Sequence, residues 1–391
     1  MRKAYSIGIL LVAVLLVLGA CAPAVVEEEE ETAPAPTSTP AVTEKLELGL
    51  VATAPSSYQL DVAPVYVGSG LCMLGSLTML LKYDAPALDF CDTIAYSGIG
   101  PSGYRQQKPT GIKFDFPQGG LWAGMVLAPR NLGYSLICGV AKGGRIDGPR
   151  FPLVQQWPRI QSEAKSIKYF DNEEYAFDFL KKVIASDYPV AVHLNVVLVM
   201  NDFAKASNRW VDMSRACTEA KITEVSHMMV VTGYDTTHVY LNDPGDPAKP
   251  TKLPTTIDNF KSAWNVQETR PPSLNVGPYW MLFIQKSSEM KSVSDILAWN
   301  KQRSVNTPSE IRLFSENPPR GFTNRQEERD IQVIAKVRLE YAKFLEKNGK
   351  KEAAAHYEQS SKLWEGLLKS STISEDLRKI ADLEEQAQGL Y

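Results

Sequence analysis

Apolar residues recur at every third or fourth position in GLCMLGSLTMLLKYD, residues 70–84. This spacing predicts a helix with one buried face. The preceding turn Gly68-Ser69-Gly70 offers Ser69 as a helix cap. Cys72 is therefore expected in the first turn, where unpaired backbone N–H groups and the helix dipole favour a thiolate. A small core residue, or one half of a disulfide, would suit the same position.

A different pattern marks SHMMVVTGYDTTHVYLNDPG, residues 226–245. Met228 to Thr232 is apolar on both faces, as in a strand buried within a sheet. The following TTHVYLND alternates between apolar and polar positions, which predicts a second strand. A three-residue loop near Asp235 would join the two strands into a hairpin.

The hairpin has two possible registers near its open end. One sets Val231 against Val239, Met229 against Leu241, and His227 against Asp243; the neighbouring register moves Asp243 one diagonal step from His227. In either register the His227 and Asp243 side chains lie within about 5–8 Å of each other. A carboxylate beside an imidazole fixes its tautomer and stabilises the imidazolium. A histidine at a strand end and an aspartate in an Asp-Pro-Gly turn are, however, both common for structural reasons alone.

The coincidence of a cysteine at a helix start with this hairpin predicts a Cys72–His227–Asp243 triad for nucleophilic catalysis. Together, GLCMLGSLTMLL and HMMVVTGYD…VYLNDPG resemble the papain-like peptidase family C-39. GGLWAGMVLAPRNLGYS (residues 119–135) and AFDFLKKVIASDYPVAVHLNV (residues 176–196) are similar to further parts of that family, and the likeness spans about residues 55–285.

The resemblance implies an α+β, papain-like cysteine peptidase fold over residues 49–288. In that fold an N-terminal helix carries the cysteine, and an antiparallel sheet carries the histidine and the aspartate. It implies attack on a peptide or amide substrate, and no cofactor. Because His193 lies in the strand-like PVAVHLNVV, it is expected to be a core or edge residue.

One departure from the family concerns the oxyanion. Papain-like enzymes place a glutamine a few residues before the cysteine, but Asp61 to Leu71 contains neither Gln nor Asn, and Gln59 is too far upstream unless the chain folds back. The candidates to replace it, or to line the cleft, are Tyr66, Ser69 and Asn242. Losing one oxyanion donor costs about 10²–10³ in turnover, so a catalytically inactive binding domain is an alternative.

A second resemblance points to acyl transfer. FCDTIAYSGIGPSGYR (residues 90–105) is similar to a glycine-rich segment of the N-terminal domain of butirosin biosynthesis protein H, an acyltransferase with a core of the same kind. The C-terminal residues 363–391 resemble the helical end that follows that domain. Acyl transfer from a carrier protein requires a cytosolic partner.

The N-terminus predicts export. Residues 1–21 have a basic start, an apolar run and the lipobox-like Leu-Gly-Ala-Cys that ends at Cys21, as in a lipoprotein signal peptide. A lipidated Cys21 would hold the protein on the outer face of a bacterial membrane. Residues 22–48 are acidic and proline-rich, which predicts a disordered tether. The net charge of −3 and the lack of a basic patch exclude nucleic acid as an expected partner.

An exported protein can form disulfides, and the three pairings of Cys72, Cys91, Cys138 and Cys217 stay open. The sequence has no C-x-x-C pair and no His-x-x-His cluster, so no metal site is predicted.

The C-terminal part is predicted as a separate helical unit. A linker is expected at residues 289–323, followed by a tetratricopeptide-like hairpin and one more helix in residues 324–391. The first helix carries an apolar stripe, which is expected to pack on the catalytic domain or on a protein partner. Its members are Ile331, Ile334, Val337, Tyr341 and Phe344.

Overall fold

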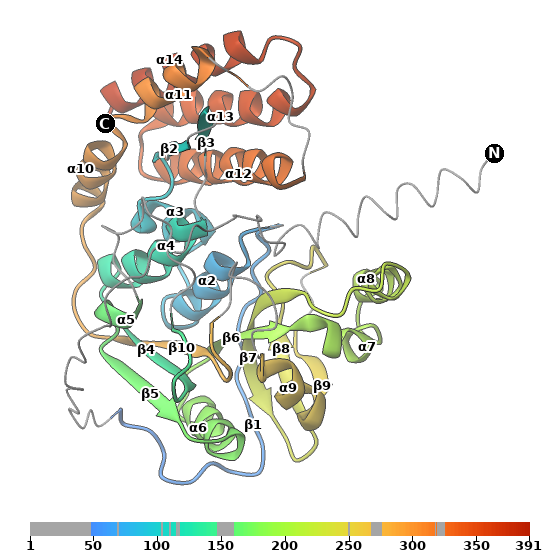
Figure 1. The fold of residues 1–391 in the computed structure, drawn as a ribbon. Coiled ribbons are helices and arrows are strands. Elements are labelled where there is room, and N and C mark those ends of the chain that lie inside the picture. Colours follow the sequence, from blue (N-terminus) through green and yellow to red (C-terminus); the bar gives the residue numbers. More distant parts are fainter. Residues whose placement is uncertain are drawn as a thin grey trace, which may run out of the picture.

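A computed structural model describes most of the chain after the predicted tether. The described residues are 48–68, 70–102, 105–108, 111–114, 118–146, 160–248, 251–266, 276–316, 318 and 325–391. The predicted signal peptide, its lipobox cysteine Cys21 and nearly all of the tether lie outside them. Within the described residues a mixed sheet is covered by helices on both faces, and a further layer of helices lies over α2, α3 and α4 (Figure 1). The predicted α+β class is confirmed.

The sheet of eight strands has the order β5-β4-β10-β6-β7-β8-β9, and β1 pairs with β7. Strands β4 and β5 are parallel, whereas the other neighbouring pairs are antiparallel. The strands are β1 (Tyr58–Gln59), β4 (Tyr134–Ala141), β5 (Ser166–Phe170), β6 (Val190–Asn195), β7 (Ser226–Tyr234), β8 (His238–Asn242), β9 (Leu253–Thr256) and β10 (Met281–Lys286). A separate hairpin joins β2 (Arg105–Lys108) to β3 (Gly111–Phe114).

The β7–β8 hairpin adopts the second of the two predicted registers at its open end. Val231 pairs with Leu241, and the pairing then shifts so that Tyr234 stands opposite Val239. The register that sets Val231 against Val239 is therefore wrong. The shift is a β-bulge at Thr232, whose carbonyl oxygen accepts a hydrogen bond from Leu60 N (2.7 Å) beside β1.

Helices of the first part of the chain cover this sheet. Helix α2 (Cys72–Asp84) packs on β7 and β6 and also contacts α3 and α4. The helix is confirmed, but its predicted single buried face is wrong, because every residue from Met73 to Leu81 is buried. The other helices are α3 (Phe90–Ser97), α4 (Gln118–Asn131), α5 (Ile160–Glu163), α6 (Glu173–Ala185), α7 (Met200–Phe203), α8 (Asn208–Glu219) and α9 (Ile257–Trp264), with a 3₁₀ turn η2 (Val196–Leu198). Both α7 and α8 belong to the connection between β6 and β7.

The predicted linker at residues 289–323 is wrong, because it holds two helices. These are α10 (Val293–Ser304) and α11 (Thr307–Glu316). Ser292 caps α10 by accepting a hydrogen bond from Asp295 N, and Ile296 and Ile311 are fully buried. Both helices therefore bury apolar residues, and this burial stabilises them although the sequence of the segment was interpreted as a linker.

The three predicted C-terminal helices are confirmed. They are α12 (Arg325–Lys347), α13 (Lys351–Gly366, extended by the 3₁₀ turn η3, Leu367–Lys369) and α14 (Ile373–Gly389). All five members of the predicted α12 stripe are buried, and α12 packs on α3 as well as on α13. The stripe therefore contacts the α+β domain of the same chain.

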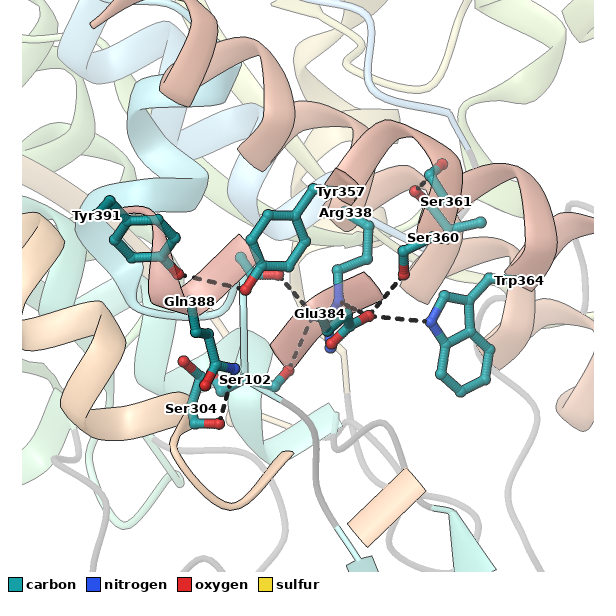
Figure 2. A network of polar contacts seen from close by, with 12 residues as sticks. Ser102, Ser304, Arg338, Tyr357, Ser360, Ser361, Trp364, Glu384, Gln388 and Tyr391 are labelled. Atoms are coloured by element: carbon teal, nitrogen blue, oxygen red, sulfur yellow. Dashed lines mark hydrogen bonds and ion pairs between the residues drawn. The ribbon is translucent and has the colours of Figure 1, made fainter. Parts of the chain in front are cut away.

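A buried ion pair joins this helical layer to the loop after α3. Arg338 donates from Nε and a terminal nitrogen to both oxygens of Glu384, at 2.8 and 3.0 Å. Its other terminal nitrogen donates to the carbonyl oxygens of Gly100 and Ser102 (Figure 2). Ser360 Oγ and Trp364 Nε1 also donate to Glu384. The C-terminal layer and the α+β domain therefore share one interior.

Candidate active site

Cys72 is the first residue of α2. The helix cap position is Leu71, two residues after the predicted Ser69, and Ser69 lies outside the described residues. Gly68 and Gly70 have φ values of 82° and 81°, which only glycine adopts readily. This turn brings the chain into α2 and leaves the Cys72 thiol half-buried at the helix start.

No disulfide joins the cysteines of the described residues: Cys72, Cys91, Cys138 and Cys217 are thiols. Among these four cysteines, none of the three possible disulfide pairings is therefore formed. Cys91, Cys138 and Cys217 are buried, so Cys72 is the most accessible of the four.

His227 lies near the start of β7 and faces Cys72. The imidazole lies close enough to the Cys72 thiol for the two groups to shift each other's pKa. Ser76 Oγ of α2 donates to Met228 O (3.2 Å), next to His227. His227 Nε2 is 2.7 Å from Asp243 Oδ1. Since Nε2 contacts the carboxylate, Nδ1 is the nitrogen that remains for the thiol.

Asp243 directly follows β8 and is completely buried. Its Oδ1 also accepts a hydrogen bond from Gly245 N (2.7 Å), and its Oδ2 accepts one from Arg209 of α8 (2.5 Å). Both carboxylate oxygens are thus occupied, and the side chain is held toward His227. The structure brings the three sequence-predicted residues together in the order Cys72, His227, Asp243.

The charges of these groups depend on each other. Burial opposes ionisation of the Cys72 thiol, but the hydrogen bond and charge of His227 outweigh burial and lower the pKa of the thiol. Burial also disfavours the imidazolium, yet Asp243 and the thiol raise the pKa of His227 to about 10. Despite its own burial, the pKa of Asp243 falls to about 2 beside His227 and Arg209. The arrangement therefore favours a thiolate–imidazolium pair at neutral pH.

The start of α2 also provides a site for negative charge. The first N–H groups of a helix have no partner within the helix, and the Cys72 N–H belongs to this turn. An oxyanion that forms when the thiolate attacks a carbonyl would lie close to this N–H. The geometry can therefore support acyl chemistry at Cys72.

The candidates for a second oxyanion donor differ in their surroundings. Tyr66 is 40% exposed, and its segment is tied to the site because Val67 N donates to Pro244 O (3.0 Å). Asn242, by contrast, is buried; its Nδ2 donates to Val62 O (2.8 Å) and its Oδ1 accepts from Lys252 N (2.9 Å). The expectation that Asn242 lines the cleft is therefore wrong, because its amide braces the chain around β8.

Gln59 does not replace the missing glutamine. It stands opposite Gly233, toward the other end of β7 from His227. Its Nε2 donates to Thr232 O (2.9 Å). The chain thus does not fold back to bring this amide to Cys72.

His193 is the buried core residue that the sequence predicts. Its Nε2 is hydrogen-bonded with Ser226 Oγ, and it lies close enough to His227 for their charges to interact. Burial and the neighbouring His227 lower the pKa of His193 to about 4. His193 is therefore neutral when His227 is charged.

Sequence reasoning missed two residues at the start of α8. Arg209 binds Asp243, and the Trp210 ring lies 6.5 Å from the His227 ring, centroid to centroid, at 60°. Neither belongs to a recognisable motif, and only the folding of the β6–β7 connection brings them to the site. A buried carboxylate needs a partner that offsets its charge, but the sequence does not show which residue supplies it.

Among the described residues, no group of three or more His, Cys, Asp or Glu side chains could hold a metal ion. In the same part of the chain, no helix combines the length and the apolar character needed to cross a bilayer.

The fold is α+β, and part of the chain resembles a known family. The Peptidase C39 like family matches residues 143–270, which include His227 and Asp243 and begin after Cys72. No curated protein matches the chain at a significant level. Among solved structures, a C39-like peptidase from Bacillus anthracis aligns with 16% identity and a TM-score of 0.33, over 60% of this chain and 100% of its own. Residues 143–270 of this chain are therefore similar to C39-like, papain-like peptidases.

Proposed function

We propose that this protein is a thiol hydrolase that cleaves a peptide or amide bond with Cys72, His227 and Asp243. The observation that carries the proposal is the series of three neighbouring groups: the Cys72 thiol interacts with His227, and His227 Nε2 lies 2.7 Å from the buried Asp243. The C39-like domain supports the reaction class. In such a series a nucleophile contacts a base that is itself held by a third group.

The proposed reaction has two halves. The Cys72 thiolate attacks the carbonyl carbon, and the carbonyl electrons move to an oxyanion near the Cys72 N–H. His227 then gives its proton to the leaving amine, and a thioester remains on Cys72. Water attacks the thioester with His227 as base, which releases the acid and restores the thiol. Asp243 keeps the imidazole in one orientation throughout.

Two alternatives follow from other features. In an acyltransferase of the butirosin biosynthesis protein H kind, an amine or hydroxyl acceptor would take the place of water in the second half. In a binding domain, the missing glutamine donor would leave the thiol without useful turnover. Digestion of a mixed peptide library, read by mass spectrometry, tests the hydrolase directly. New termini in the parent that are absent with Cys72→Ala support it; equal patterns from both proteins would reject it.

We further propose that Cys21 is lipidated and that the acidic tether holds the domain outside a bacterial membrane. The support is the sequence alone: the Leu-Gly-Ala-Cys run directly after the apolar segment. A substrate reached in this way would be an extracellular or periplasmic peptide.

A further inference from the structure

Arg209 is the positively charged residue that forms an ion pair with the Asp243 carboxylate. Its guanidinium donates to Asp243 Oδ2 at 2.5 Å, on the opposite side of the carboxylate from His227. The Arg209 side chain is 19% exposed and the Asp243 side chain is fully buried. Its terminal nitrogens also lie against Gly245, where an added Cβ would be 3.1 Å from the guanidinium.

The start of α8 holds the whole turn after β8, not Asp243 alone. Ser207 Oγ, just before α8, donates to Asp246 Oδ2 (2.7 Å), and Asp246 is fully buried. Next along the helix, Trp210 packs between the Arg209 guanidinium, 5.1 Å from the ring centroid, and the His227 ring. A tryptophan face beneath a guanidinium fixes its position and favours its charge.

Several charged or titratable groups face the Cys72–His227 pair from the elements packed around it. Asp243 interacts with both members, and His193 of β6 interacts with His227. Asp246 lies in the same turn as Asp243, and the Arg329 side chain of α12 lies against Gly70, before Cys72. Arg209 is distinguished from Arg329 by its direct ion pair with the triad carboxylate.

The balance of charge shows what Arg209 can do. With the thiolate and imidazolium formed, Cys72, His227, Asp243 and Arg209 carry two negative and two positive charges. When His227 gives up its proton, a buried Asp243 without Arg209 would have no counter-charge, and a buried unpaired charge is costly. With Arg209 in place, Asp243 stays ionised whether or not His227 is protonated.

We propose that Arg209 is a positioning residue of the active site that keeps Asp243 ionised and leaves His227 able to release its proton. The proposal rests on the proposed function, since it assigns a role within the same reaction. Because Arg209 pairs with Asp243 and not with the thiol or the imidazole, it acts through Asp243.

The test is the pH dependence of Cys72 alkylation by iodoacetamide, resolved from the other cysteines by mass spectrometry. Removal of a positive charge near the pair disfavours the thiolate, so Arg209→Gln should move the low-pH limb of the profile up by roughly one pH unit. Arg209→Lys keeps the charge and should retain the parent limb. Arg215→Gln is the matched control, because Arg215 is a 54% exposed residue of the same helix.

A low-pH limb in Arg209→Gln that coincides with that of Arg215→Gln would overturn the proposal. If Arg209→Gln does not fold, a second comparison replaces it. The single variant Asp243→Asn is then compared with the double variant that carries both Asp243→Asn and Arg209→Gln. The double variant buries no unpaired charge. Because Arg209 acts through Asp243, the two low-pH limbs should coincide, and an upward shift in the double variant would overturn the proposal as well.

The outcome for the proposed function is distinct. If the parent Cys72 shows no reactivity below the range of an ordinary thiol, the triad itself fails. If the parent reacts there and only the Arg209 comparisons show no shift, the triad stands and the role of Arg209 fails.

Discussion

His227 Nε2 lies 2.7 Å from Asp243 Oδ1, although the two residues stand a diagonal step apart in the β7–β8 hairpin. Gly245 N and Arg209 bind the same carboxylate, so these two contacts set its direction toward His227. A base held in this way stays oriented while its proton moves. This relationship determines the expected reactivity of Cys72.

The parent Cys72 should react with iodoacetamide at pH 6, well below the ordinary thiol pKa of about 8.5. His227 lowers the pKa of the Cys72 thiol, so His227→Ala should abolish the reaction at that pH. Asp243→Asn should weaken the reaction less, because the imidazole remains and loses only its orienting charge. The rate of labelling is measured for each cysteine by mass spectrometry of its peptide.

Cys91 provides the internal control, since burial raises the pKa of its thiol to about 12. It should remain unlabelled at pH 6 in every folded variant. If Cys72 labels no faster than Cys91 in the parent, and His227→Ala changes nothing, catalysis is excluded and the domain is a binding module.

Thermal stability should depend on Asp243 in a defined pH range. The folded pKa of Asp243 is about 2 and lies below its unfolded value, so its ionised form stabilises the protein above about pH 4. That contribution is lost as the pH falls through about 2. Asp243→Asn should therefore lower the Tm at pH 7, and the gap to the parent should narrow from about pH 4 toward pH 2, as measured by circular dichroism.

Asp171→Asn serves as the control for this series, because Asp171 is 72% exposed. Its Tm should follow that of the parent across the same range. A constant difference in Tm between the parent and Asp243→Asn from pH 7 to pH 2 would contradict the ionised carboxylate.

On the alkaline side, the His227 imidazolium contributes fully to stability below about pH 6.5, and its contribution is lost as the pH rises through about 10.

Gly70→Ala should disturb the loop that carries Cys72. The φ of 81° costs an L-residue about 1–2 kcal/mol, and an added Cβ would lie only 2.8 Å from Val333 Cγ2 of α12. Because α12 packs against this loop, the alanine should reduce both Tm and Cys72 labelling. Denaturant unfolding and the iodoacetamide rate measure the two effects.

Gly143→Ala isolates the backbone cost, since Gly143 has a φ of 79° and open space around its Cα. Gly70→Ala should destabilise the protein more than Gly143→Ala does, and the added Val333→Ala substitution should recover part of the difference. Equal effects of the two glycine substitutions would mean that α12 does not constrain the loop.

Arg338→Met should destabilise the protein strongly. Both Arg338 and Glu384 are fully buried, and breaking such a pair by removing one partner costs about 3–5 kcal/mol. Arg312→Met is the matched control, because Arg312 pairs with Asp382 and Glu385 but is 37% exposed; it should cost about 0–1 kcal/mol. A similar small loss in both variants, measured by urea unfolding, would show that the C-terminal layer is not fixed by the buried pair.

Cys21→Ala should release the protein from the membrane. An unlipidated chain lacks acyl chains to bury in the bilayer, so the variant should move from the detergent phase to the aqueous phase in Triton X-114 partition. Cys72→Ala should partition as the parent does. If Cys21→Ala remains in the detergent phase, the lipoprotein proposal is wrong.

Local sequence patterns determined the elements of the site. The three- and four-residue apolar spacing around Cys72 defines α2, and the apolar run before Tyr234 defines a buried β7. The Asp235 turn and the alternation after it define the hairpin and bring His227 near Asp243. Each of these features depends on residues close in the chain, so periodicity and turn chemistry reveal them.

The tertiary structure alone decided which distant groups complete the site. The hairpin register depends on a bulge at Thr232, whose carbonyl is bound beside β1, about 170 residues earlier in the chain. Arg209 reaches Asp243, and Val333 reaches Gly70, only because α8 and α12 fold onto the catalytic core. Such contacts leave no periodic or motif signal, since either residue would suit its own helix equally well on a solvent-facing surface. The sequence could predict that Cys72, His227 and Asp243 lie together, whereas long-range packing selected the residues that bind them.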